Sequence, residues 1–293
     1  MVRDFSGASA VVCGGRRVAV AEYGDPEGRP VFLLHGTPAS RLGNDFADAP
    51  ARERGIRVLC PDRGGIGRSD PVPGRTVAGY AGELVELADA LGIDEFAVIG
   101  YSGGGPFAVA CAAGCGPRLT SVGLMAAVAP VDDRPGARDG LAASDRHLLD
   151  AAVRSPFRAG LVLRFERVVT LLVPALAVRE LSAELTPVDR AELARHTPRE
   201  AMAGFVEALR PGPDGVLTDY RLWGSPWRVD WSAVTVPVHV FQGDADPFVP
   251  VHHAEDLVRR LPAGVGHLHL LPGVGHLSLQ TRFGEILDAL GRG

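Results

Sequence analysis

The chain has 293 residues, of which 46% are hydrophobic, with a formal net charge of -5 and a mean hydropathy of +0.11. This length and composition predict one large α/β domain, or such a core with an insertion. The weak charge imbalance argues against nucleic acid or an acidic membrane as a partner. All 30 basic residues are arginine, which excludes a phosphate-loop lysine, a Schiff base and a serine–lysine dyad.

The terminal and cysteine patterns suggest a cytoplasmic protein. The first 15 residues hold no apolar run long enough for a signal peptide, and the run over 168–178 is too short for a membrane span. The four cysteines lie in apolar segments, which indicates buried thiols rather than disulfides or zinc ligands. We therefore expect no membrane partner, no metal and no organic cofactor. The oligomeric state is not predicted.

The first half of the chain alternates apolar runs with amphipathic stretches. In chain order, we expect a hairpin through Gly14 and Gly15, strands over 30–36, 56–62, 95–102 and 119–129, and helices over 77–92 and 103–114. Short apolar runs separated by helices are typical of a mostly parallel sheet covered on both faces. An α/β fold is therefore predicted.

The sequence pattern changes between Asp133 and Asp230. Strand-like runs disappear, and helical patterns rich in arginine and glutamate replace them. Thr186-Pro187 and Thr197-Pro198 are typical of helix starts. The alternation then resumes with a strand over 236–244, a helix over 251–261, a strand over 267–273 and a final helix. We interpret the interruption as a helical insertion.

Gly100 and Ser102 stand at the end of the expected strand over 95–102, and three more glycines follow it. Gly100-Tyr101-Ser102-Gly103-Gly104 fits the pattern G-x-S-x-G between a buried strand and a helix, where a sharp turn exposes the serine hydroxyl. The relaxed dinucleotide fingerprint Gly103-x-Gly105-x-x-Ala108 is weak, because the first acidic residue after the next strand comes late. A plain glycine-rich turn is the other alternative. We predict that Ser102 is a nucleophile.

A serine hydroxyl needs a base, and nine histidines compete for that role. His276 lies in a Pro-Gly loop after a strand, where its side chain can reach across the carboxyl edge of the sheet. His267 and His269 share one face of that strand and are interpreted as packed or edge residues, although such a pair could bind metal. His252 and His253 are interpreted as capping or surface residues. We choose His276.

The base needs a carboxylate to orient it. Asp246 lies farther into the loop after the strand over 236–244 than Asp244, which is interpreted as a turn cap. Asp132 and Asp133 are less favoured. We expect Asp246 to face His276.

Acyl chemistry also needs donors for an oxyanion. The loop after the strand over 30–36 offers the N–H of Thr37, which could pair with that of Gly103. Gly36 precedes it, and His35 is interpreted as a structural residue that braces the loop.

Taken together, these motifs resemble the α/β-hydrolase fold superfamily over nearly the whole chain. "HGTP" is similar to the family's oxyanion loop, "DRGGIGRSD" to the turn after its fourth strand, "GYSGG" to its nucleophile elbow, "GDADPFVP" to its acid loop and "GVGH" to its histidine loop. The resemblance implies an eight-stranded, mostly parallel sheet with a helical cap after strand six. The expected domains are a core over 1–133 and 231–293 and a cap over 134–230.

The resemblance also shapes the expected activity. A serine at the elbow argues against epoxide hydrolases and haloalkane dehalogenases, which use aspartate there. We expect a carboxylic-ester hydrolase acting on a largely apolar small molecule. The alternatives are C–C bond hydrolysis, acyl transfer or cyclisation with the same residues, and a non-catalytic binding protein. Apolar side chains expected to line the pocket, or to form the core of the cap, are Phe157, Leu161, Leu163, Phe165, Leu171, Leu172, Phe205 and Leu222.

Overall fold

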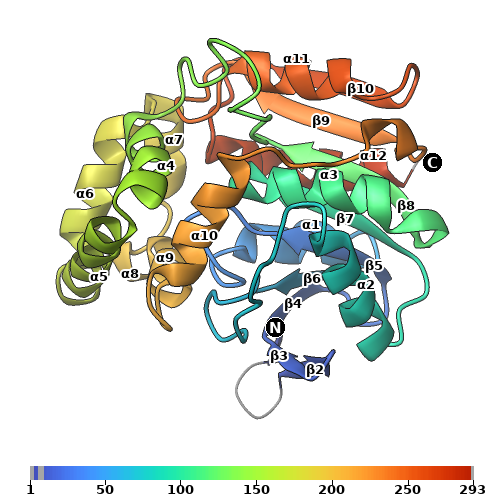
Figure 1. The fold of residues 1–293 in the computed structure, drawn as a ribbon, viewed down its shortest axis with the longest axis horizontal. Helices are drawn as coiled ribbons and strands as arrows, with labels where there is room; N and C mark the ends of the chain where they lie inside the picture. Colours follow the sequence, from blue (N-terminus) through green and yellow to red (C-terminus); the bar gives the residue numbers. More distant parts are fainter. Residues whose placement is uncertain (1–2, 6–9, 292–293) are drawn as a thin grey trace.

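The computed structural model describes residues 3–5 and 10–291 and is built around one eight-stranded sheet (Figure 1). Its strand order is β1-β4-β6-β5-β7-β8-β9-β10. β1 and β4 pair antiparallel with their neighbours, and the remaining strands run parallel. The mostly parallel eight-stranded sheet is confirmed. The bounds are β1 Arg3–Phe5, β4 Val20–Gly24, β5 Arg29–Leu34, β6 Ile56–Pro61, β7 Phe96–Tyr101, β8 Leu119–Met125, β9 Val238–Gly243 and β10 Gly266–Leu271.

The predicted hairpin is present, but it stands apart from the main sheet. β2 (Val11–Cys13) and β3 (Arg16–Val18) pair antiparallel, and both turn glycines have positive φ, at 54° for Gly14 and 74° for Gly15. Positive φ at two consecutive turn residues suits glycine because it has no Cβ to clash.

Helices cover both faces of the sheet, as the continuous apolar strands require. One face packs against α2 (Tyr80–Ala90), α3 (Gly105–Gly114) and α11 (Val251–Arg260), and the other against α1 (Asp48–Arg52) and α12 (Phe283–Leu290). All four cysteines are free and buried, as expected.

Between β8 and β9 lies a run of seven helices, which we call the helical segment (143–223). It stands to one side of the sheet in Figure 1. Its helices are α4 Ala143–Arg154, α5 Pro156–Leu172, α6 Pro174–Glu184, α7 Pro187–Leu193, α8 Pro198–Ala201, α9 Ala203–Ala208 and α10 Asp214–Trp223. The threonine caps at Thr186 and Thr197 form as the sequence predicts, each accepting a bond from a backbone N–H.

The parallel strands place four loops at one edge of the sheet. β5, β7, β9 and β10 all point their carboxyl ends the same way. The segments that follow them therefore meet above that edge, where open α/β sheets bind their ligands. These segments contain Thr37, Ser102, Asp246 and His276.

Candidate active site

Ser102 stands at a sharp turn between β7 and α3. Its φ is 53°, a left-handed conformation that non-glycine residues rarely adopt and that costs of the order of 1–3 kcal/mol. The turn passes so close to β5 that a Cβ on Gly104 would collide with the carbonyl oxygens of Leu34 and His35. The glycines after Ser102 thus allow the strand-to-helix turn that exposes the serine.

The loop after β5 lies against this turn. A Cβ placed on Gly103 would be 2.8 Å from Thr37 Oγ1 and 3.1 Å from Thr37 N, and one placed on Gly36 would be 3.8 Å from Ser102 Oγ. Gly103 also stands at the amino end of α3, where unpaired N–H groups and the helix dipole favour negative charge. The backbones of Thr37 and Gly103 are therefore neighbours beside Ser102.

His276 and Asp246 are in direct contact. His276 Nδ1 lies 2.8 Å from Asp246 Oδ2, and the Asp246 side chain is fully buried. Gln242 Nε2 also donates to Oδ2, at 3.1 Å, while the N–H groups of Phe248 and Val249 donate to Oδ1 at 2.8 and 2.9 Å. An ionised carboxylate can only accept, so Nδ1 carries the proton and Nε2 keeps its lone pair.

The electrostatics of His276 favour its charged form. Burial alone would lower the pKa of its imidazole, but the charge and hydrogen bond of Asp246, reinforced by Asp145 and Asp189, raise that pKa above its ordinary value. An imidazole with a raised pKa accepts a proton more readily. This is the property a general base needs.

Aromatic rings hold the imidazole in place. The Tyr101 ring stacks on His276 with a centroid separation of 5.2 Å, and its hydroxyl donates to the His276 carbonyl oxygen at 3.1 Å. Phe248 packs on His276 at 5.1 Å. Within residues 3–5 and 10–291, no hydrogen bond joins Ser102 Oγ to His276, a contact that in free enzymes often tightens only when substrate binds.

The helical segment supplies a carboxylate that the sequence analysis did not find. Asp189, in α7, accepts hydrogen bonds from the backbone N–H groups of His276 (3.0 Å) and Ser278 (2.8 Å). It is fully buried and lies so close that a side chain on Gly275 would collide with it. Asp189 therefore fixes the turn that carries His276.

A second carboxylate from this segment anchors the loop after β5. Asp219, in α10, accepts hydrogen bonds from Arg63 Nη2 at 2.7 Å and from Thr37 Oγ1 at 3.1 Å, and it pairs with Arg75 at 2.5 Å. Burial alone would raise the pKa of Asp219, but Arg63 and Arg75 hold it at about 2. The carboxylate is thus ionised between two buried arginines.

Arg63 connects Asp219 to the rest of the loop. Its guanidinium donates to the carbonyl oxygens of His35 and Gly36 and to Thr37 Oγ1. Its backbone N–H faces His35 Nε2, so Nε2 accepts and Nδ1–H donates to the Gly36 carbonyl oxygen at 2.8 Å. Burial and the neighbouring Arg63 keep the pKa of His35 well below its ordinary value. His35 is therefore a neutral member of this hydrogen-bonded network of Asp219, Arg63, His35 and Thr37, which we call the brace.

A third carboxylate lies near the imidazole. Asp145, at the start of α4, accepts a hydrogen bond from the Tyr220 hydroxyl at 2.8 Å. Burial raises the pKa of Asp145 to about 6, against the lowering effects of Tyr220 and His276. Asp145 therefore raises the pKa of His276, and His276 lowers that of Asp145.

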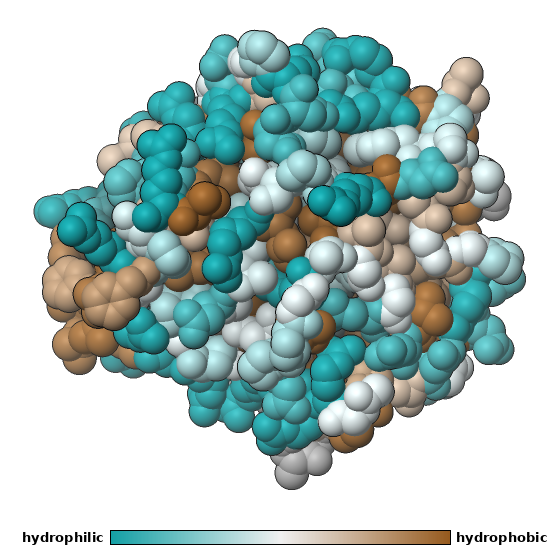
Figure 2. Space-filling view, viewed as in Figure 1, coloured by the Kyte–Doolittle hydropathy of each residue, from teal (hydrophilic) through white to brown (hydrophobic). Residues whose placement is uncertain are grey.

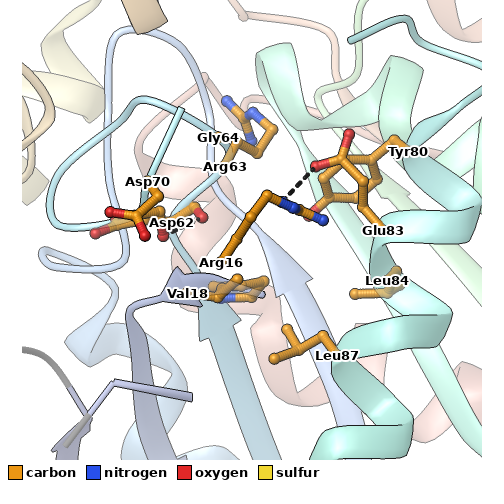
Figure 3. Close-up of a pocket in the computed structure, with 12 residues that line it drawn as sticks. Arg16, Val18, Asp62, Arg63, Gly64, Asp70, Tyr80, Glu83, Leu84 and Leu87 are labelled. Atoms are coloured by element: carbon orange, nitrogen blue, oxygen red, sulfur yellow. Dashed lines mark hydrogen bonds and ion pairs between the residues drawn. The ribbon is translucent and has the colours of Figure 1, made fainter. Parts of the chain in front are cut away.

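Arg63 also lines a small cavity, together with Arg16, Tyr80 and Glu83 (Figure 3). It has a volume of about 20 Å³, room for about one water molecule, between the turn after β6 and helix α2. Arg16 reaches across it to Glu83 at 3.7 Å. Ser102, Asp246 and His276 do not line it, and its size excludes an organic substrate.

The other candidate side chains have different surroundings. Asp244 accepts a bond from the Gly273 N–H at 2.7 Å. His267 and His269 cluster with His239, which lies 3.2 Å from His269 Nε2. His253 is not a surface residue: it is buried, its Nδ1 accepts from the Ala129 N–H at 3.1 Å, and burial lowers its pKa to about 3.

The apolar side chains expected around a pocket divide into two sets. Leu163 is buried and Phe205 packs against the apolar cluster that contains it, whereas Leu222 packs against the sheet core. The five others are between 46% and 76% exposed: Phe157, Leu161, Phe165, Leu171 and Leu172. The exposed set does not fit the expectation of a pocket lining.

Within the described ranges, 3–5 and 10–291, no cluster of three or more His, Cys, Asp or Glu side chains could hold a metal ion. None of the helices in the same ranges is both long and apolar enough to cross a bilayer.

Comparisons with known proteins agree with this architecture. The family described as alpha/beta hydrolase fold matches residues 29–282. An uncharacterised hydrolase of Bacillus subtilis is 26% identical over 256 residues, covering 86% of each chain, and a non-heme haloperoxidase of Rhodococcus erythropolis is 26% identical over 267 residues, covering 89% of this chain and 90% of the relative. Among solved structures, an esterase from Exiguobacterium antarcticum superposes with a TM-score of 0.71 at 18% identity, over 97% of this chain and 98% of the esterase.

Proposed function

Because the chain belongs to the α/β-hydrolase family, we propose that it is a serine hydrolase that cleaves a carboxylic ester through an acyl-enzyme. Ser102 is the nucleophile, His276 the general base and acid, and Asp246 the residue that orients His276. The observation that carries the proposal is the 2.8 Å contact between His276 and Asp246, at the sheet edge where Ser102 stands in a strained turn.

The reaction proceeds in two halves. His276 Nε2 takes the proton from Ser102 Oγ as the oxygen attacks the ester carbonyl, and the N–H groups of Thr37 and Gly103 stabilise the oxyanion. The intermediate collapses, and His276 gives its proton to the departing alcohol. Water then loses a proton to His276 and attacks the acyl carbon; as the bond to Ser102 Oγ breaks, His276 returns that proton to Ser102 Oγ, and the acid is released.

The surroundings of each group support these roles. The hydrogen bond to Asp246 fixes the tautomer of His276 and stabilises the imidazolium that forms in both halves. Each backbone donor at an oxyanion is worth about 3–4 kcal/mol. Together with the hydrogen bonds of Arg63 and Asp219 that hold the Thr37 loop, this favours a catalytic role over simple ligand binding.

For the substrate, we propose a small and largely apolar ester, with residues 134–230 acting as a cap over it. The Val128 N–H faces the Ser102 carbonyl oxygen at 3.4 Å, and Val128 belongs to an apolar cluster that continues to Leu163 and Tyr220 of the helical segment. An apolar cluster that begins beside Ser102 supports an apolar substrate. C–C bond hydrolysis and acyl transfer use the same groups and are tested as alternatives.

A fluorophosphonate label followed by intact mass measurement tests the nucleophile. We expect one adduct on the wild-type chain, none on Ser102→Ala, and strongly slowed labelling of His276→Ala. The matched controls are Ser232→Ala, on a remote turn, and His267→Ala, on the edge strand, which should both label like the wild type. An adduct that persists in Ser102→Ala would refute the assignment.

A series of p-nitrophenyl esters then tests the reaction. We expect a burst of p-nitrophenol and faster turnover as the acyl chain lengthens from acetate. Labelling at Ser102 without ester turnover would reject ester hydrolysis in favour of C–C cleavage or acyl transfer. Equal rates for acetate and octanoate would reject the apolar substrate.

A further inference from the structure

An apolar stripe runs along the outer face of the helical segment. It consists of six side chains of α5, each between 46% and 76% exposed, which we call the α5 stripe: Phe157, Leu161, Phe165, Val168, Leu171 and Leu172. Phe157, Leu161, Phe165 and Val168 follow one another at spacings of three or four residues, and Leu171 and Leu172 come three and four residues after Val168, so all six lie on one side of the helix. The opposite side of α5 is buried against the rest of the segment through Ala159, Gly160 and Leu163.

The stripe is visible on the molecular surface. Figure 2 shows brown and tan side chains gathered at the lower left margin, where Figure 1 places α5. The exposed fractions of the six residues correspond to an apolar area on the order of 600 Å². Soluble monomers rarely expose a contiguous apolar patch above a few hundred Å². The stripe is therefore large enough to mark an interface.

The area fits a second copy of the chain. A specific protein–protein interface buries about 600–1,000 Å² on each partner, so two stripes facing each other reach the lower end of that range. An anionic membrane fits less well, because the chain carries a net charge of -5. The area of the stripe and the net charge of the chain both favour self-association.

The pattern of the stripe is also self-complementary. If two copies of α5 pack antiparallel about a two-fold axis near Phe165, Phe157 of each copy meets Leu172 of the other, and Leu161 meets Val168. A two-fold interface requires this kind of reciprocal match, since each surface must fit itself. Arg164, an exposed residue within the stripe between Leu161 and Val168, then comes next to Phe165 of the other copy, where a guanidinium can pack on the aromatic ring.

We propose that the α5 stripe is the interface of a homodimer in which two α5 helices pack antiparallel about a two-fold axis near Phe165. The dimer joins the molecules through their helical segments and leaves the two sheets far apart.

Sedimentation or light scattering of the purified chain tests the dimer. The wild type should have twice the 30.8 kDa chain mass at micromolar concentration, and Phe165→Glu should have the mass of one chain. The matched control is Val12→Glu, a charge placed on an equally exposed valine of β2, which should stay dimeric. Thermal melting and fluorophosphonate labelling of Phe165→Glu check that the variant is folded.

Crosslinking tests the geometry. The native cysteines are buried, so a short bismaleimide should react only with an introduced thiol. Phe165→Cys should crosslink to itself, whereas Phe157→Cys should not, because two copies of that position lie roughly 22 Å apart in the antiparallel register. A mixture of Phe157→Cys and Leu172→Cys should give crosslinked heterodimers.

Three results would overturn the proposal. The first is a wild-type chain that stays monomeric throughout the concentration range. The second is a dimer that survives Phe165→Glu. The third is a monomer that binds phosphatidylglycerol vesicles through the stripe, which would identify a lipid surface as the occupant.

Discussion

The sheet core and the helical segment differ in how completely they bury their apolar side chains. All six residues of β7 are buried, and the core on each face of the sheet is apolar. In the helical segment, α6 has no buried residue at all, and α5 exposes its apolar stripe. The segment meets the sheet-edge loops through the apolar cluster that contains Val128 and through the carboxylates of Asp189 and Asp219.

This difference teaches how the site is divided between the two regions. The core supplies the proposed reacting groups, because Ser102, Asp246 and His276 all lie at or after the ends of strands of the sheet. The helical segment supplies groups that position them, since its carboxylates hold the loops of Thr37 and His276 from outside. The helical segment is thus a structural part of the candidate site, because its carboxylates hold two of the site's loops.

The largest expected effect comes from the buried pair of Arg63 and Asp219. Asp219→Asn leaves two buried arginines without a counter-ion, which should cost about 3–5 kcal/mol and lower the melting temperature by about 5–10 °C. Calorimetry measures this loss. Glu285→Gln, which breaks an exposed pair with Arg282, should change the free energy of unfolding by less than about 1 kcal/mol.

The same variant tests the positioning role. We expect kcat for an ester substrate to fall about tenfold with little change in KM, because a displaced Thr37 N–H weakens binding of the transition state only. In the wild type, the lowered pKa of Asp219 means that the pair stabilises the fold above pH 4, and that this contribution is lost as pH falls towards 2. An unchanged kcat would contradict the brace.

A smaller effect is expected from Asp189→Ala. It leaves the N–H groups of His276 and Ser278 without an acceptor, at a cost of about 1–3 kcal/mol for each group that water does not reach. Denaturant unfolding and the rate of fluorophosphonate labelling should both report the loss. Val188→Ala, at an exposed neighbour on α7, should change neither. Labelling of Asp189→Ala at the wild-type rate would show that the turn holds its shape unaided.

The smallest effect concerns the pH profile. The Asp145 carboxylate raises the pKa of His276, so Asp145→Asn should lower that pKa and move the acid limb of kcat/KM to lower pH, by less than one unit. The shift is limited because the pKa of Asp145 is itself about 6, so its charge fades over the same range. Asp150→Asn, on the exposed side of α4, is the control and should not move the limb. A shift to higher pH would be inconsistent with the arrangement described.

The sequence predicts those parts of the molecule that depend on neighbours along the chain. Buried strands, the glycine-rich turn at Ser102 and the loops of Asp246 and His276 are each local patterns of about ten residues. Their meeting at one edge follows from parallel strands. The eight-stranded sheet is confirmed, whereas the chemical roles and the domain limits at 133 and 231 stay predictions.

The contributions of the helical segment could not be predicted in the same way. Asp189 meets a backbone 87 residues later, and Asp219 meets a side chain 182 residues earlier. No local pattern encodes such pairings. The sequence predicted that apolar side chains of this region would line a pocket or form the core of the cap, but a helical pattern does not tell whether an apolar side chain points inward or outward. For this reason the sequence did not predict that the α5 stripe would be exposed.

The order of the supporting residues along the chain has a consequence for biosynthesis. A ribosome makes Ser102 first, then Asp189 and Asp219, then Asp246, and His276 after all of them. In the proposed mechanism, the serine hydroxyl therefore has no proton acceptor until the residues that orient that acceptor have been made. A growing polypeptide of this design would carry its proposed nucleophile in an unreactive form while it is still being translated.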